Sequence, residues 1–130
     1  MNYIKSKDEF SKLIETKDEI VIFCFHDRSI YSVVAQAIVE DWKSKYSRDI
    51  MIDDLSYIDQ EHYFLNWLMR QENGDWVKEG IMTSDKYSPQ KRIHGNGEIC
   101  WIKNQDLIGF EIIYNSFNSE ALEQRTQELF

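Results

Sequence analysis

Apolar residues along this chain fall into two patterns, short continuous runs and stretches with helical spacing. Near the start, Ser6 is followed three residues later by a glutamate, which is the capping-box pattern at a helix N-terminus. Phe10 and Ile14 then recur on one helical face, so the pattern predicts a helix over about 7–16. Tyr3 and the residue after it suggest a brief strand before this helix.

The run Ile20–Phe25 is continuously apolar and rich in β-branched and aromatic residues. It predicts a central strand buried on both faces. A polar turn over 26–29 follows, and then a helix over about 29–46. Its apolar positions recur three and four apart, and we expect this stripe to face the core. The stripe comprises Ile30, Val33, Val34, Ala37, Ile38 and Trp42.

The middle of the chain is predicted to continue with a strand over 50–52 and a helix over about 60–72. Asp53 and Asp54 end the strand, and we expect them to meet solvent. The stripe of the helix comprises Tyr63, Phe64, Trp67 and Leu68, and Asn73–Gly74 stops it. Residues 75–95 form a long excursion with one short helix or strand. A long connection of this kind is either functional or a family-specific decoration.

The C-terminal part reads as a hairpin and a helix. Strands are predicted over 98–103 and 107–114, joined by turn residues. Asn118 or Ser119 caps the final helix, whose apolar residues dock it. The whole chain, 1–130, is therefore expected to form a single α/β domain. A mixed central sheet of four to five strands would have helices on both faces.

Composition narrows the classes of partner. The net charge is −8 and the pI about 4.8. Nucleic-acid binding normally needs a basic surface, and an anionic membrane would repel this chain, so neither partner is expected. A basic protein partner stays open beside the simpler explanation that the charge serves solubility. The N-terminus has no apolar signal core and no run is long enough to span a membrane, so we expect a cytoplasmic protein.

The two cysteines, Cys24 and Cys100, lie far apart in apolar, strand-like runs and form no CxxC pair. We expect both to pack in the core as small hydrophobic residues. The alternative is a disulfide or a reactive thiol. Neighbouring strands seldom satisfy disulfide geometry, and burial makes a thiol slow to react.

The order of elements and several local strings resemble the thioredoxin family. The strand Val21–Phe25 and the helix that contains Val33-Val34-Ala35-Gln36 resemble the strand and helix that flank the WCGPC motif. Counted back from the helix, Arg28-Ser29-Ile30-Tyr31 fill the CGPC positions. The run Gly97–Gln105 resembles the strand that the family's cis-proline opens, with Gly97 at the proline position.

This resemblance implies a three-layer, thioredoxin-like fold from which both halves of the redox apparatus are missing. Dithiol exchange needs an exposed thiolate at a helix N-terminus and a second thiol within reach. Neither is present in 26–31. The resemblance therefore implies a divergent, non-redox member of the family.

The turn at 26–31 and the loop at 95–97 mark the place where such a sheet binds ligands, beyond the carboxyl ends of its parallel strands. Either these residues form a recognition surface, or Asp27 or Ser29 simply caps the helix while Arg28 is solvated. Trp76, in the excursion, either anchors a partner or pins the loop. The candidate binding residues are His26, Asp27, Arg28, Tyr31, Trp76, Gly95, Asn96 and Gly97.

No catalytic residue, cofactor or metal site is predicted. The three histidines, with Asp53, Asp54 and Asp59, lack the spacing of zinc motifs. Gly95-x-Gly97 is not a nucleotide loop, because it has no third glycine and does not open a helix.

Three functions stay open on the sequence. The first is a non-catalytic protein-binding module, one that neutralises or accompanies a partner protein. The second is an atypical thiol-redox protein that uses Cys24 or Cys100. The third is an enzyme with a pocket under the excursion. Oligomeric state cannot be read from these patterns.

Overall fold

A computed structural model describes residues 2–56, 64, 67 and 95–130. The elements are β1 (Asn2–Tyr3), α1 (Lys7–Thr16), β2 (Glu19–Phe25), α2 (Ile30–Tyr46), β3 (Ile50–Asp54), β4 (Asn96–Lys103), β5 (Asp106–Ile112) and α6 (Ser119–Leu129). None of the helices in this part of the chain has both the length and the apolar character needed to cross a membrane.

The five strands form one mixed sheet in the order β1-β3-β2-β4-β5. β1, β3 and β2 run parallel, while β4 and β5 are antiparallel to their neighbours. The predicted α/β sheet of four to five strands is confirmed. β2 lies at its centre with five consecutive buried residues, as the continuous apolar run indicated.

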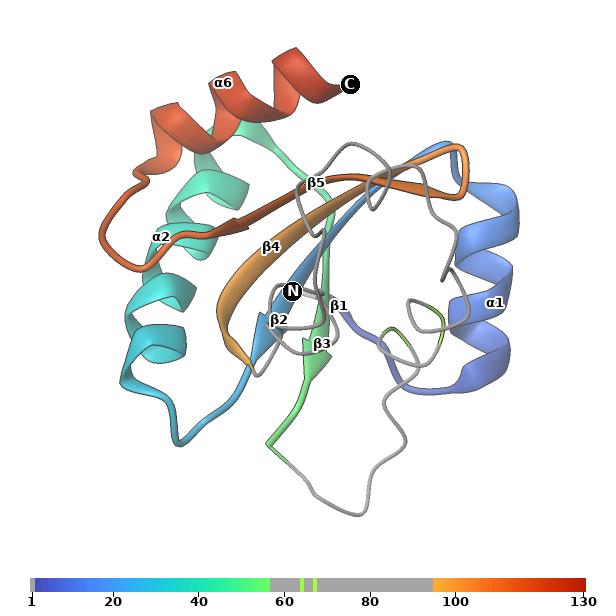
Figure 1. The fold of residues 1–130 in the computed structure, drawn as a ribbon, viewed down its shortest axis with the longest axis horizontal. Helices are drawn as coiled ribbons and strands as arrows, with labels where there is room; N and C mark the ends of the chain where they lie inside the picture. Colours follow the sequence, from blue (N-terminus) through green and yellow to red (C-terminus); the bar gives the residue numbers. More distant parts are fainter. Residues whose placement is uncertain (1, 57–63, 65–66, 68–94) are drawn as a thin grey trace, which may run out of the picture.

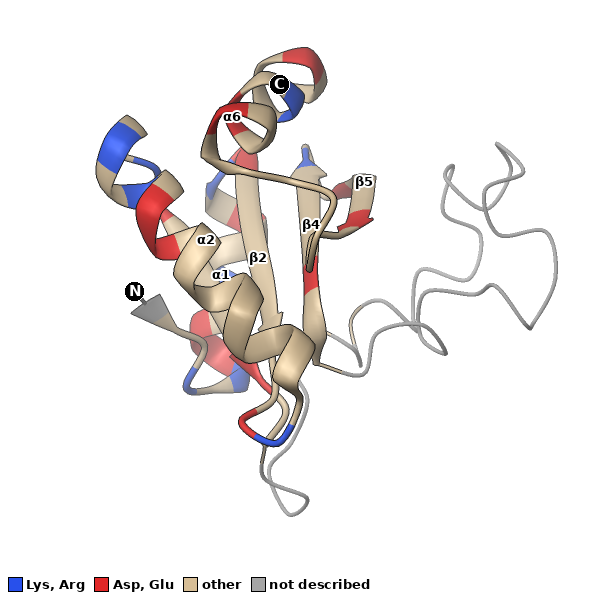
Figure 2. Cartoon of the chain, turned by 90° about the vertical axis from the view of Figure 1, so that its left-hand side faces the viewer, with Lys and Arg blue, Asp and Glu red and all other residues tan. Residues whose placement is uncertain are grey.

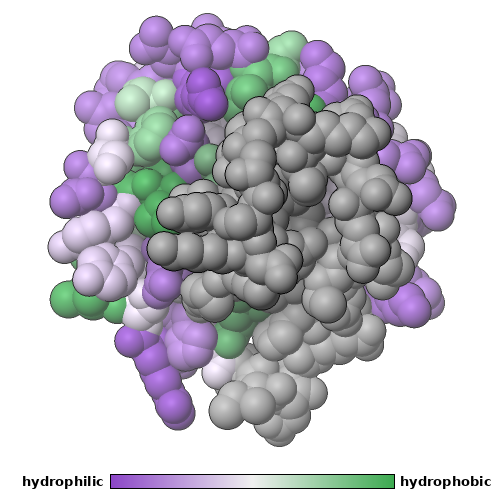
Figure 3. Space-filling view, viewed as in Figure 1, coloured by the Kyte–Doolittle hydropathy of each residue, from purple (hydrophilic) through white to green (hydrophobic). Residues whose placement is uncertain are grey.

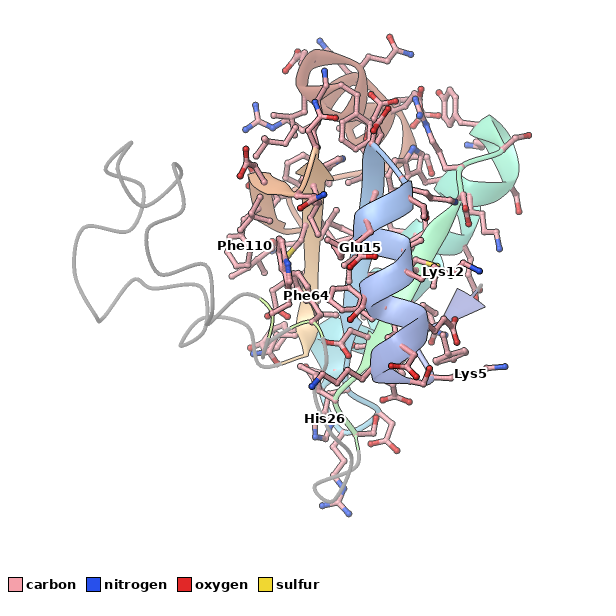
Figure 4. All side chains as sticks on the ribbon, turned by 90° about the vertical axis from the view of Figure 1, so that its right-hand side faces the viewer. Lys5, Lys12, Glu15, His26, Phe64 and Phe110 are labelled. Carbon is pink, nitrogen blue, oxygen red and sulfur yellow. The ribbon has the colours of Figure 1, made fainter. Side chains whose placement is uncertain are left out.

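Helices cover both faces of the sheet (Figure 1). On one face α1 packs through Phe10 and Ile14, together with the buried rings of Phe64 and Trp67. Phe64 lies between α1 and the sheet in Figure 4. Phe64 and Trp67 are the only members of the predicted 60–72 stripe among the described residues. Residues 75–94 of the excursion also lie outside the described residues.

On the other face α2 and α6 pack side by side (Figure 2). Buried hydrogen bonds join α6 to the sheet and to α2. Trp101 Nε1 donates to Thr126 Oγ1 at 2.9 Å, and Trp42 Nε1 donates to Glu123 Oε1 at 3.0 Å. The same Glu123 carboxylate accepts from Arg48 at 2.5 and 2.7 Å.

The helix starts agree with the capping residues that the sequence indicates. Ser6 accepts a hydrogen bond from the backbone N–H of Glu9, and Asn118 accepts one from that of Ala121. Of the two alternatives for the last helix, Asn118 is therefore the cap. Of the two alternatives for α2, Ser29 rather than Asp27 is the N-cap.

Two expectations about burial are wrong. Asp53 does not meet solvent: it is 4% exposed, because its side chain shares the α1 face of the sheet with its neighbour Cys24 on β2. The set of α2 residues predicted to face the core is also wrong, since only Trp42 is buried and Ile38 is partly buried. The buried residues of α2 are Ser32, Ala35, Val39 and Trp42.

Candidate functional site

The turn between β2 and α2 is held by its own hydrogen bonds. The backbone N–H of Ser29 donates to the carbonyl of His26, and the backbone N–H of Arg28 donates to His26 Nδ1 at 3.0 Å. The backbone N–H of His26 donates to Ser32 Oγ at 2.9 Å. His26 is therefore a structural part of the turn, and Figure 4 shows it at the end of the sheet. Arg28 is exposed, as the simpler interpretation held.

The loop at 95–97 lies against this turn. Ser29 Oγ donates to Asn96 Oδ1 at 2.7 Å. Gly95 has φ +79°, and a Cβ there would lie 2.6 Å from the His26 Cβ. The buried Glu98 carboxylate fixes the loop, because it accepts from the backbone N–H groups of Gly95 and Asn96 at 3.1 Å.

Gly97 packs against helix α2. Its φ is +84°, and a Cβ would lie 2.5 Å from the Ala35 Cβ and 3.3 Å from the Tyr31 carbonyl oxygen. A side chain at 97 would therefore both strain the backbone and push the helix away. The described residues contain no cis peptide bond. The backbone at Gly97 therefore lies directly against helix α2.

An open pocket of about 370 Å³ lies between the turn and the loop. It is lined by His26, Arg28, Ser29, Ile30, Tyr31 and Asn96. The structure thus brings together the predicted residues of the turn and the loop, while Trp76 lies outside the described residues. Tyr31 also makes an edge-on contact with Tyr114, with ring centroids 4.7 Å apart, a pairing that the sequence did not indicate.

The most notable feature beside this pocket is the solvent-facing side of α2. Ile30, Val33 and Val34 are 68%, 48% and 40% exposed, and Ala37 is exposed as well. These four residues, which we call the α2 face, recur at spacings of three and four and form one stripe. Figure 3 shows hydrophobic surface on the left of the molecule, where α2 lies in Figure 1. The helical spacing of these residues predicted that they face the core, and this prediction is wrong.

The reason for this error is that α2 is apolar on more than one side. Every residue from Ile30 to Val39 is apolar or aromatic except Ser32 and Gln36, so periodicity alone cannot select the buried side. Close packing selects it: β4 carries Gly97, and the small side chains of Ser32 and Ala35 allow the helix to approach there. A glycine in a strand opposite two small residues on a helix is the signal that could have located this contact.

No protein-family model and no curated protein matches the chain. Solved structures do match. One is a proposed oxidoreductase with a thioredoxin fold, at TM-score 0.57 and 13% identity, covering 95% of this chain and 90% of the other. Another is a yeast mitochondrial 1-Cys peroxiredoxin, at TM-score 0.55 and 20% identity, covering 99% and 95%.

This chain has a thioredoxin-like fold. The sequence resemblance is confirmed at this level, since low identity supports the fold and not an activity. In this thioredoxin-like fold the α2 face and the open pocket lie at the start of the helix that follows the central strand β2.

Both cysteines of the thioredoxin-like domain are buried and free. They lie on neighbouring strands, as expected, with Cys24 opposite Glu98 and Cys100 opposite Ile22. Burial is the main cause that raises the pKa of the Cys24 thiol well above its ordinary value, and contact with Cys100 adds to it. A thiol in this state is protonated near neutral pH and is a poor nucleophile.

Two buried carboxylates accompany the thiols on the same side of the sheet. Asp53 and Glu98 flank Cys24 on the two adjacent strands. Burial, together with the charge of Asp54, raises the pKa of Asp53 to about 7, and among the described residues its Oδ2 has no hydrogen-bond partner. In the part of the chain that the structure describes, no three histidine, cysteine or acidic side chains are arranged to hold a metal ion.

Proposed function

We propose that this chain is a non-catalytic protein-binding module that recognises its partner through the α2 face and the adjoining pocket. The observation that carries the proposal is the α2 face itself, which exposes three large aliphatic side chains in one stripe. A stripe of this kind on the surface of a globular protein is typical of an interaction site.

Charge and shape support a protein partner rather than a small ligand. α2 carries no charged residue from Ile30 to Val39. A partner that covers this part of the helix therefore does not have to desolvate a charged side chain. Arg28 and Tyr31, at the edge of the stripe, are residue types that often anchor protein interfaces. The pocket is wide open, whereas sites for small molecules usually enclose most of the ligand.

The proposal also includes the loss of dithiol chemistry. In it, Arg28–Tyr31 replace the CGPC positions of the thioredoxin family and Gly97 replaces the cis-proline. The module would neutralise or accompany its partner in the cytoplasm. The buried Cys24 and Cys100 support this, because neither offers an exposed thiolate at the start of α2.

The test is capture of a partner by the purified full chain, compared with the variant V33E/V34E. Both sites are exposed, so the variant should fold as the wild type does, which circular dichroism checks. We expect a specific partner to be captured by the wild type and lost from V33E/V34E. The matched control is K12E on the exposed side of α1, which changes the net charge by the same amount (Figure 4). Equal capture by all three chains would contradict the proposal.

The rival proposal, an atypical thiol-redox protein, has one observation in its favour, namely the contact between the Cys24 and Cys100 side chains. Titration with a chromogenic disulfide reagent distinguishes the two. If the chain is a binding module, both thiols should stay unreactive when it is folded and react only in urea. Rapid reaction of either thiol in the folded chain would favour the rival.

A further inference from the structure

The α2 face is bounded at its two ends by opposite charges. Arg28 lies in the turn that leads into α2, and Glu40, seven residues after Val33, lies at one edge of the stripe just beyond Ala37. Both are exposed, and among the described residues neither side chain forms an ion pair. Figure 2 shows the uncharged part of α2 between a turn and a farther stretch of helix that each carry both acidic and basic residues.

Other charges lie near these ends as well. The exposed Asp27 carboxylate lies 3.6 Å from His26 Nδ1, the atom that accepts from the Arg28 N–H, and Lys43 follows Glu40 by three residues. Asp41 accepts from the Ser119 hydroxyl and pairs with Lys45 at 3.2 Å. Arg28 and Glu40 lie nearest the two ends of the stripe, and no described residue forms an ion pair with either.

This arrangement is complementary to itself. The stripe from Ile30 to Ala37 is centred between Val33 and Val34. At a rise of about 1.5 Å per residue, the first helical residue, Ile30, lies about 5 Å before this centre and Glu40 about 10 Å after it. Arg28 lies two residues before Ile30 in the turn, so it is farther from the centre than Ile30. Two copies of the helix packed antiparallel about a two-fold axis at the centre would therefore place Arg28 of each copy opposite the partner's Glu40.

We propose that the α2 face binds a second copy of this chain, as a two-fold dimer with antiparallel α2 helices and reciprocal Arg28–Glu40 ion pairs. The valines would pack at the centre, where the absence of charged side chains keeps the free-energy cost of desolvation low. This inference rests on the proposed function, because it assigns the occupant of the same face. One helical stripe per copy is a small interface, so we expect a dissociation constant on the order of 10–100 μM.

The first measurement is sedimentation velocity of the full chain from about 5 to about 500 μM, a range that spans the expected dissociation constant. The wild type and K12E should shift from monomer to dimer across this range, and V33E/V34E should stay monomeric. A wild type that remains monomeric at the highest concentration overturns the inference. Dimerisation of V33E/V34E equal to that of the wild type overturns it as well, because another surface would then be responsible.

The second measurement uses charge reversal, which identifies the register. R28E places two acidic groups at each contact, and E40R places two basic groups there, so each variant alone should dimerise at least tenfold more weakly. The double variant R28E/E40R restores both pairs and should dimerise as the wild type does. A mixture of R28E and E40R should form a heterodimer, because both of its contacts are then complementary.

Failure of the mixture to associate, or equal dimerisation by every charge variant, overturns the proposed register and with it this inference. These outcomes are separate from the test of the proposed function. A monomeric wild type that captures another protein, with capture lost in V33E/V34E, would leave the binding module standing and remove only the second copy as its occupant.

Discussion

The buried carboxyl of Asp53 should make the protein less stable as the pH rises toward neutrality. Its pKa is about 7 in the folded chain, against an ordinary value of 3.8, because burial and the Asp54 charge disfavour the ionised form. Between these two values the folded state keeps a proton that the unfolded state has released. The stabilisation from that proton is full below the unfolded value, declines through the window, and is exhausted above about pH 7.

The magnitude follows from the width of this window. Each pH unit within it costs about 1.4 kcal/mol, so the total approaches about 4 kcal/mol. D53N replaces the carboxyl with a neutral group of the same shape. We expect D53N to match the wild type near pH 4 and to exceed its free energy of unfolding by up to about 4 kcal/mol near pH 8.

Urea unfolding, followed by tryptophan fluorescence at several pH values, measures this difference. The difference between D53N and the wild type isolates Asp53, because the other titrating groups are common to both chains. D18N, at an exposed aspartate, is the matched control and should show no such trend. A difference that stays constant from pH 4 to pH 8, or a D53N chain that is less stable than the wild type at pH 8, would contradict this prediction.

Three further changes should alter the stability of the fold measurably. E123Q should cost about 3 kcal/mol in urea unfolding, because it leaves the guanidinium of Arg48 without its buried partner. The pKa of Glu123 is about 2, mainly because of that ion pair, so its contribution should disappear as the pH falls from 4.5 toward 2, and E123Q should abolish this acid-dependent loss. G97A should cost about 2–4 kcal/mol through its positive φ and its clash with Ala35, and A35G should recover part of that cost in a double-mutant cycle. S29A should cost about 1 kcal/mol by removing the cap of α2, with a shift in thermal midpoint as the readout.

Local patterns in the sequence were sufficient to predict the described strands and helices and most of the residues at which they begin and end. A strand such as β2, buried on both faces, is apolar throughout, and a cap such as Ser6 or Asn118 acts on backbone groups within three residues of itself. These are local signals, and they are sufficient to predict the order of strands and helices and from it the thioredoxin-like sheet. They also placed the turn at His26–Ser29 and the loop at Gly95–Gly97 at the same end of that sheet.

The buried side of α2 and the surroundings of Asp53 depend on how distant parts of the chain pack together. Periodicity identifies a buried side when polar residues mark the exposed one. In the first ten positions of α2 only Ser32 and Gln36 are polar, and Ser32 is buried, so they do not mark it. Its orientation depends instead on how closely Ala35 can approach Gly97, a contact between residues far apart in the chain. The burial of Asp53 likewise follows from its place beside Cys24 in the sheet, because exposure is a property of the neighbours that pack around a side chain.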